Sequence, residues 1–62
     1  MIDAIHRAQQ ALKPYEKQAP LPEQITLLLT DLMHLADARG QKVDWLTVMI
    51  RAQNRHYRDK HG

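Results

Sequence analysis

The sequence predicts an all-α fold of three short helices, and three observations support this prediction. Its 62 residues are rich in Leu, Ala, Gln and Arg, which favour helices, and they include no phenylalanine and only two glycines. Apolar residues recur every three to four positions in three separate segments. Prolines and Gly40 divide these segments from one another. We therefore expect a single helical domain over residues 1–62.

The first predicted helix covers residues 2–13. Asp3 lies early enough to favour the positive N-terminal end, and Pro14 disfavours helical geometry in the residue before it. A linker follows at 14–21, where Pro20 keeps the chain extended. The apolar stripe of this helix consists of Ile2, Ile5, Ala8 and Leu12. We expect the helix to pack through that stripe across the other two helices.

The second predicted helix covers residues 22–39 and is the most apolar of the three. Pro22 suits its first turn, and Gly40 can adopt the left-handed conformation that ends helices. Leu27 falls on the opposite side from the main apolar arc, beside His34, so we expect it to be exposed. The arc itself consists of Ile25, Leu28, Leu29, Leu32, Met33, Leu35 and Ala36.

The third predicted helix covers residues 45–60 and begins after Asp44, a favourable N-cap residue. Its expected core stripe consists of Trp45, Met49, Ala52 and His56, widened by Leu46 and Val48. Basic and polar residues occupy the other side, and Ile50 and Tyr57 form a strip between the two sides. Because the turn before this helix is short, we predict that the second and third helices form an antiparallel hairpin.

The length of the chain suggests a partner. A chain this short buries only about 60% of the surface that its unfolded state exposes, and without cysteine no disulfide can compensate. We therefore predict a homodimer. The N-terminal residues do not resemble a signal peptide, and no apolar run is long enough to span a membrane. We accordingly expect a cytoplasmic protein that does not bind a membrane.

The residues needed for catalysis are largely missing. The chain contains no serine and no cysteine, so the commonest nucleophiles are absent. Asp31, His34 and Asp37 follow one another at spacings of three, which leaves a metal site or the remnant of a metal-dependent phosphohydrolase as an alternative. Such sites draw ligands from more than one helix, and this chain offers few others. We predict no enzymatic activity, no cofactor and no metal.

Positive charge is concentrated in the C-terminal half, where residues 32–62 carry six Lys and Arg against three Asp and Glu. A nucleic-acid-binding role through the third helix is therefore a second alternative. In a helix-turn-helix, however, the first residues of the second helix read the bases, and here those residues include Trp45, Leu46 and Met49. A net charge of only +2 also fits DNA poorly.

The stretch Asp31-Leu32-Met33-His34-Leu35-Ala36-Asp37, the glycine turn at Gly40, and the pair His56-Tyr57 carry a family resemblance. Over residues 31–59 the chain resembles small helical proteins of proteobacterial phages, plasmids and conjugative elements. The resemblance implies an accessory or regulatory role for a mobile element. Small antiactivators that bind a host or element transcription factor are one pattern for such a role.

Together these features predict a non-enzymatic regulatory protein that binds a partner protein and covers its surface. A helix lying in a groove is the expected mode of binding. The expected anchors are Leu27, Leu28, Ile50 and Tyr57, with Arg51, Arg55 and Arg58 attracting an acidic partner.

Overall fold

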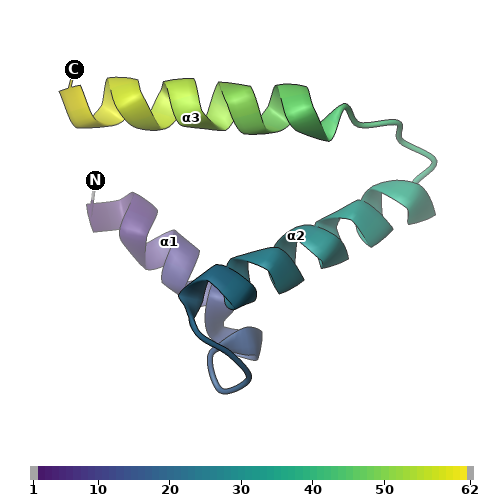
Figure 1. Cartoon of the computed structure of the whole chain (residues 1–62), viewed down its shortest axis with the longest axis horizontal. Coiled ribbons are helices and arrows are strands. Elements are labelled where there is room, and N and C mark those ends of the chain that lie inside the picture. Colours follow the sequence, from purple (N-terminus) through teal and green to yellow (C-terminus); the bar gives the residue numbers. More distant parts are fainter. Residues whose placement is uncertain (1, 62) are drawn as a thin grey trace.

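A computed structural model describes residues 2–61, and all regular structure within that range is helical (Figure 1). Helix α1 spans Ile2–Leu12, a 3₁₀ helix η1 spans Lys13–Tyr15, α2 spans Leu21–Ala38 and α3 spans Trp45–His61. The predicted all-helical fold with three helices is confirmed for the described residues. The 3₁₀ helix occupies part of the segment that we expected to be a linker, because Pro14 fits the first turn of a helix.

Tyr15 and Gln24 hold η1 and the following linker against α2. The Tyr15 hydroxyl donates a hydrogen bond to the Asp31 carboxylate, and the Gln24 side-chain amide donates to the Ala19 carbonyl at 2.8 Å. Residues 24 and 31 lie two helical turns apart, so these bonds mark one side of α2. Leu27 and Leu28 fall between them on that side, and both are half-buried.

Gly40 ends α2. Its φ is +66°, its amide donates to the Asp37 carbonyl at 3.0 Å, and the Gln41 amide donates to the Ala36 carbonyl at 3.0 Å. This pair of bonds is the Schellman arrangement, which satisfies carbonyls that the helix end would leave unpaired. The predicted left-handed glycine is therefore present, and α2 cannot run on into α3.

Asp44 begins α3. Its carboxylate accepts hydrogen bonds from the Thr47 backbone amide at 3.2 Å and from the Thr47 hydroxyl at 2.8 Å. These bonds, and a further one from the Leu46 amide, lower the pKa of Asp44, although partial loss of hydration opposes the shift. The predicted N-cap is present and fixes the residue at which α3 starts.

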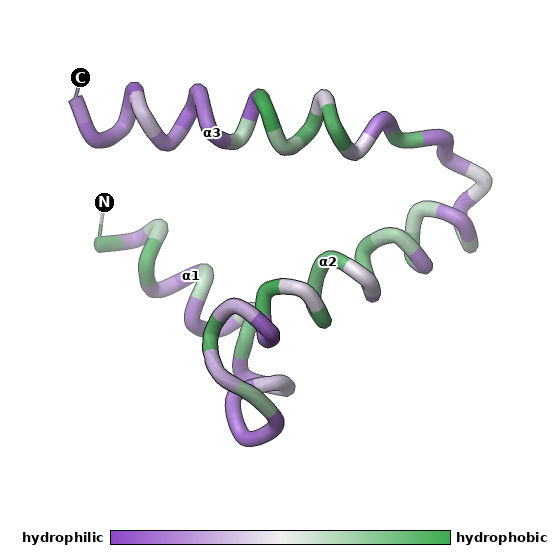
Figure 2. Tube along the Cα trace, in the orientation of Figure 1, coloured by the Kyte–Doolittle hydropathy of each residue, from purple (hydrophilic) through white to green (hydrophobic). Residues whose placement is uncertain are grey.

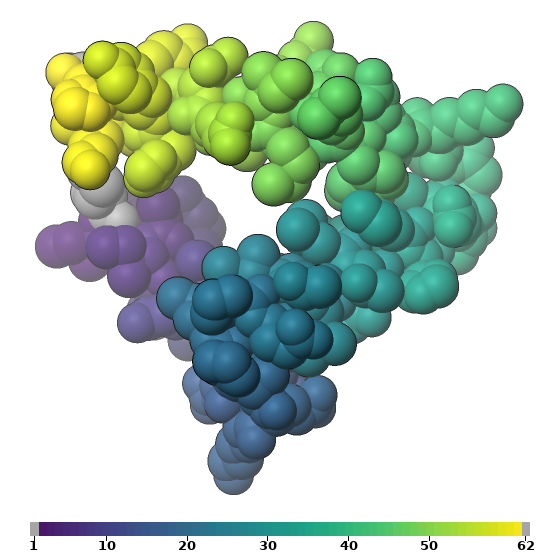
Figure 3. Space-filling model, in the orientation of Figure 1, coloured from purple at the N-terminus to yellow at the C-terminus, as the bar shows by residue number. Residues whose placement is uncertain are grey.

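The three helices form an open arrangement in which α3 stands apart (Figure 1). No Cα atom of α3 lies within 8 Å of a Cα atom of α1, η1 or α2. Figure 3 shows a gap between α3 and the other helices. The radius of gyration is 13.1 Å, whereas a compact chain of this length has about 10.6 Å. The close packing of α2 on α3 that an antiparallel hairpin requires is thus not observed.

Two expectations about apolar residues are wrong. Ile2 and Ile5 are 82% and 55% exposed, and Ala8 is also exposed, so α1 approaches α2 only through its C-terminal end, where Leu12 is half-buried. Leu27 is half-buried, and it lies on α2 between Gln24 and Asp31, which bond to the preceding segment. Helical periodicity correctly places Leu27 away from the main apolar arc. It does not indicate that the side of α2 that carries Leu27 is also partly covered.

Candidate protein-binding surface

Helix α3 carries an exposed apolar strip, which we define as Leu46, Ile50 and Tyr57. These side chains are 73%, 49% and 64% exposed. At about 100° per residue they point within roughly 40° of one another. The Tyr57 ring packs against the His61 ring with centroids 4.3 Å apart, so Tyr57 lies along the helix. Figure 2 shows that α3 changes from hydrophobic in its first half to hydrophilic in its second.

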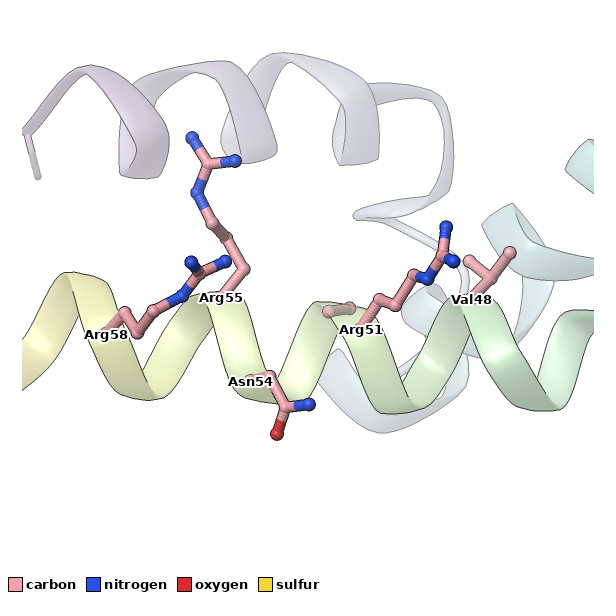
Figure 4. Close-up of a pocket in the computed structure, with 6 residues that line it drawn as sticks. Val48, Arg51, Asn54, Arg55 and Arg58 are labelled. Atoms are coloured by element: carbon pink, nitrogen blue, oxygen red, sulfur yellow. The ribbon is translucent and has the colours of Figure 1, made fainter.

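A second feature of α3 is the arginine row, which we define as Arg51, Arg55 and Arg58. Figure 4 shows the three side chains on one side of the helix, with Asn54 turned away from them. They line a hollow of about 780 Å³ together with Val48 and Ala52. Every residue that lines this hollow belongs to α3, so it is an open surface along one helix. No second element of the described chain forms a wall.

The arginines of this row keep most of their charge available. Within the described residues, the ion pair found in the row joins Arg55 to Asp59 at 3.6 Å, with side chains 75% and 57% exposed. Such an exposed pair one turn apart on a helix is weak, because water screens both charges. Helix α3 carries Arg51, Arg55, Arg58 and Lys60 against Asp59 alone. An acidic partner would therefore meet a strongly cationic helix.

The structure separates the seven predicted contact residues into two groups. Ile50, Tyr57 and the arginine row are exposed together on α3. Leu27 and Leu28 are half-buried on α2, on the side held by Tyr15. They therefore do not share the exposed surface of α3.

Sequence reasoning missed two residues. Leu46 was expected in the core stripe, yet it is the most exposed member of the α3 strip. Its position four residues before Ile50 is the signal that could have identified it. Tyr15 was given no role, although its hydroxyl bonds to Asp31. That hydrogen bond, then loss of hydration and the negative charge of Asp31, raise the pKa of Tyr15.

The acidic residues of α2 do not assemble a metal centre. Among residues 2–61, no three side chains of the His, Asp and Glu type converge closely enough to hold a metal ion. Asp31 is engaged by Tyr15, while His34 and Asp37 are exposed on the same helix. Over the same range, none of the helices combines the length and apolar character that a membrane span requires.

Comparison with known protein families, with curated protein sequences and with solved structures gives no match. The functional interpretation therefore depends on the exposed surfaces of α3 and α2.

Proposed function

We propose that this protein is a non-enzymatic regulator that binds a partner protein through α3 and covers part of its surface. The observation that supports the proposal is the α3 strip, a row of apolar side chains exposed on a helix whose Cα atoms all lie more than 8 Å from those of the other described helices. Large apolar residues that are exposed together mark interaction surfaces. Exposure of apolar surface to water is unfavourable in free energy, so a partner that covers this surface gains binding free energy.

The spacing of the strip suits a helix that lies in a groove. Ile50 and Tyr57 follow Leu46 by about one and about three helical turns, and the strip extends over roughly 17 Å of the helix. The aromatic ring of Tyr57 offers the largest area and a polar hydroxyl at its tip, which is typical of residues that dominate binding energy. The partner should offer an apolar groove of about this length.

The arginine row defines the charge of that partner. Around the helix the row is separated from the strip by roughly 130°, so the arginines would lie at the rim of a groove that holds the strip. Charges at the rim of an interface mainly accelerate association and exclude wrong partners. We therefore expect acidic side chains along one edge of the groove.

The resemblance of residues 31–59 to small proteins of mobile elements suggests which partner to seek. A transcriptional regulator of the host or of the element, held inactive when its groove is covered, fits both the resemblance and the cationic, amphipathic α3. On this proposal the protein is an accessory of a phage, plasmid or conjugative element.

Capture and reconstitution test the proposal. The immobilised protein should retain an acidic partner from a lysate of a bacterium that carries the element, and the purified pair should bind in calorimetry. Ile50→Asp should weaken that binding at least tenfold, since it places a charge in the centre of the strip. Gln9→Asp, at an exposed position on α1, is the matched control and should leave binding unchanged. Equal binding by both variants would contradict the proposal.

Nucleic acid is the second candidate, and the arginine row is the observation that favours it. Three arginines that each contact a phosphate would give a slope of about −2.7 for the logarithm of the affinity against the logarithm of the salt concentration. Fluorescence anisotropy with labelled duplex DNA would measure this slope. We favour a protein partner because Val48 and Ala52 lie among the arginines and add apolar surface to the row.

A further inference from the structure

We infer that a second copy of this chain packs against α2 and forms a two-fold dimer through an apolar face that the single chain leaves open. We define the α2 face as Ile25, Leu29, Leu32 and Ala36. Ile25 and Leu32 are 44% and 39% exposed, and Leu29 and Ala36 are half-buried. The hydrogen bonds to Gln24 and Asp31 mark a different side of α2, roughly 120° around the helix. Neither of these two hydrogen-bonded contacts with the preceding segment therefore falls on the α2 face.

The accessible surface of the whole chain is larger than that of a compact monomer and leaves room for a further contact. The chain exposes 5703 Å², whereas a compact monomer of its mass exposes roughly 4,100 Å². The difference of about 1,600 Å² per chain exceeds the roughly 800 Å² per partner of a standard interface and matches that of permanent homodimers. No side chain within residues 2–61 is fully buried, so such a contact would supply the hydrophobic core.

The chain's own α3 is poorly placed to cover this face. The connection between the two helices is held at both ends, by the bonds around Gly40 and by the Asp44 cap. In the structure no Cα atom of α3 lies within 8 Å of a Cα atom of α2, so the chain's own α3 does not cover the face.

The spacing of the α2 face is self-complementary, and this identifies the second copy as the occupant. The intervals along the face are four, three and four residues, so the set reads the same in both directions. An antiparallel pair of α2 helices then places Ile25 of one copy opposite Ala36 of the other, and Leu29 opposite Leu32. Large residues meet at the centre and a large residue meets a small one at each end, as two-fold packing requires.

This dimer is independent of the proposed function, because it uses α2 whereas partner binding uses α3. Light scattering should give twice the 7.2 kDa mass of the chain at micromolar concentration. The melting temperature should rise by about 10 °C for each hundredfold increase in concentration, because two chains separate on unfolding. A 7.2 kDa particle whose melting temperature is independent of concentration would overturn the inference.

Cysteine cross-linking tests the antiparallel register without weakening the fold. The chain has no cysteine of its own. In the double variant Ile25→Cys/Ala36→Cys, the two thiols of one chain are roughly 16 Å apart along α2, too far for an internal disulfide. Mild oxidation should therefore convert this variant to a covalent dimer within minutes. The matched control Ile25→Cys/His34→Cys should give no covalent dimer, because His34 lies on the opposite side of α2. Equal cross-linking of both variants would overturn the proposed register.

Discussion

Replacing Gly40 with alanine should destabilise the protein by about 1 kcal/mol, and the structure gives the reason. Gly40 has a φ of +66°, and a Cβ atom placed there would have nothing within 4 Å. The substitution therefore causes no clash, and its whole effect is conformational. An L-residue in the left-handed conformation lowers the free energy of unfolding by about 1–2 kcal/mol. Alanine also restricts the unfolded chain more than glycine does, and this effect restores about 0.4–1 kcal/mol.

The assay is thermal unfolding followed by circular dichroism at one fixed protein concentration. An unfolding entropy of about 2.1 cal/mol/K per residue converts 1 kcal/mol to a fall of roughly 8 °C in the melting temperature. The matched control is D-alanine at position 40 in a synthetic chain, since D-residues favour positive φ. That variant should melt about 3–8 °C higher than the natural chain. If L-alanine left the melting temperature unchanged, the left-handed turn would not be what ends α2.

Three further predictions concern Tyr15, Asp44 and the arginine row. Tyr15→Phe should lower the melting temperature by a few degrees, roughly the effect of one hydrogen bond. The raised pKa of Tyr15 stabilises the fold below about pH 10 and loses that contribution as the pH rises through the folded value, so melts at alkaline pH should converge for the two proteins. Asp44→Ala should also lower the melting temperature by a few degrees, as expected for loss of an N-cap. Because the pKa of Asp44 is lowered from 3.8, the difference should persist above about pH 4 and disappear as the pH falls through the lower folded value. Arg51→Gln/Arg55→Gln should slow partner association several-fold at low salt and much less at high salt, which stopped-flow fluorescence would measure.

Local signals in the sequence were sufficient to predict the helices. Pro14, Gly40 and Asp44 act on their immediate neighbours, through φ preferences and through hydrogen bonds that span three to five residues. The structure shows Gly40 with positive φ and Asp44 bonded to Thr47. The exposed strip and row of α3 were mostly predictable as well, because helical periodicity places residues on a face whatever lies beyond it.

The contacts between helices were not predictable in this way. Tyr15 and Asp31 are 16 residues apart, and nothing in the pattern around either residue indicates that they meet. Periodicity gives the direction of a side chain on its own helix, but it does not say which neighbour covers that direction. For the same reason periodicity predicts an exposed Leu27, whereas this side chain is half-buried in the structure.

The sequence by itself determined that the chain is helical, where each helix begins and ends, and which residues share a face. These properties depend on interactions within a few residues. Only the tertiary structure decided that α1 and η1 contact one side of α2 and that α3 stands apart. Those outcomes depend on long-range contacts and on the geometry of the two capped ends that join α2 to α3. This open arrangement leaves the α3 strip exposed and the α2 face partly exposed for the two associations proposed for this protein.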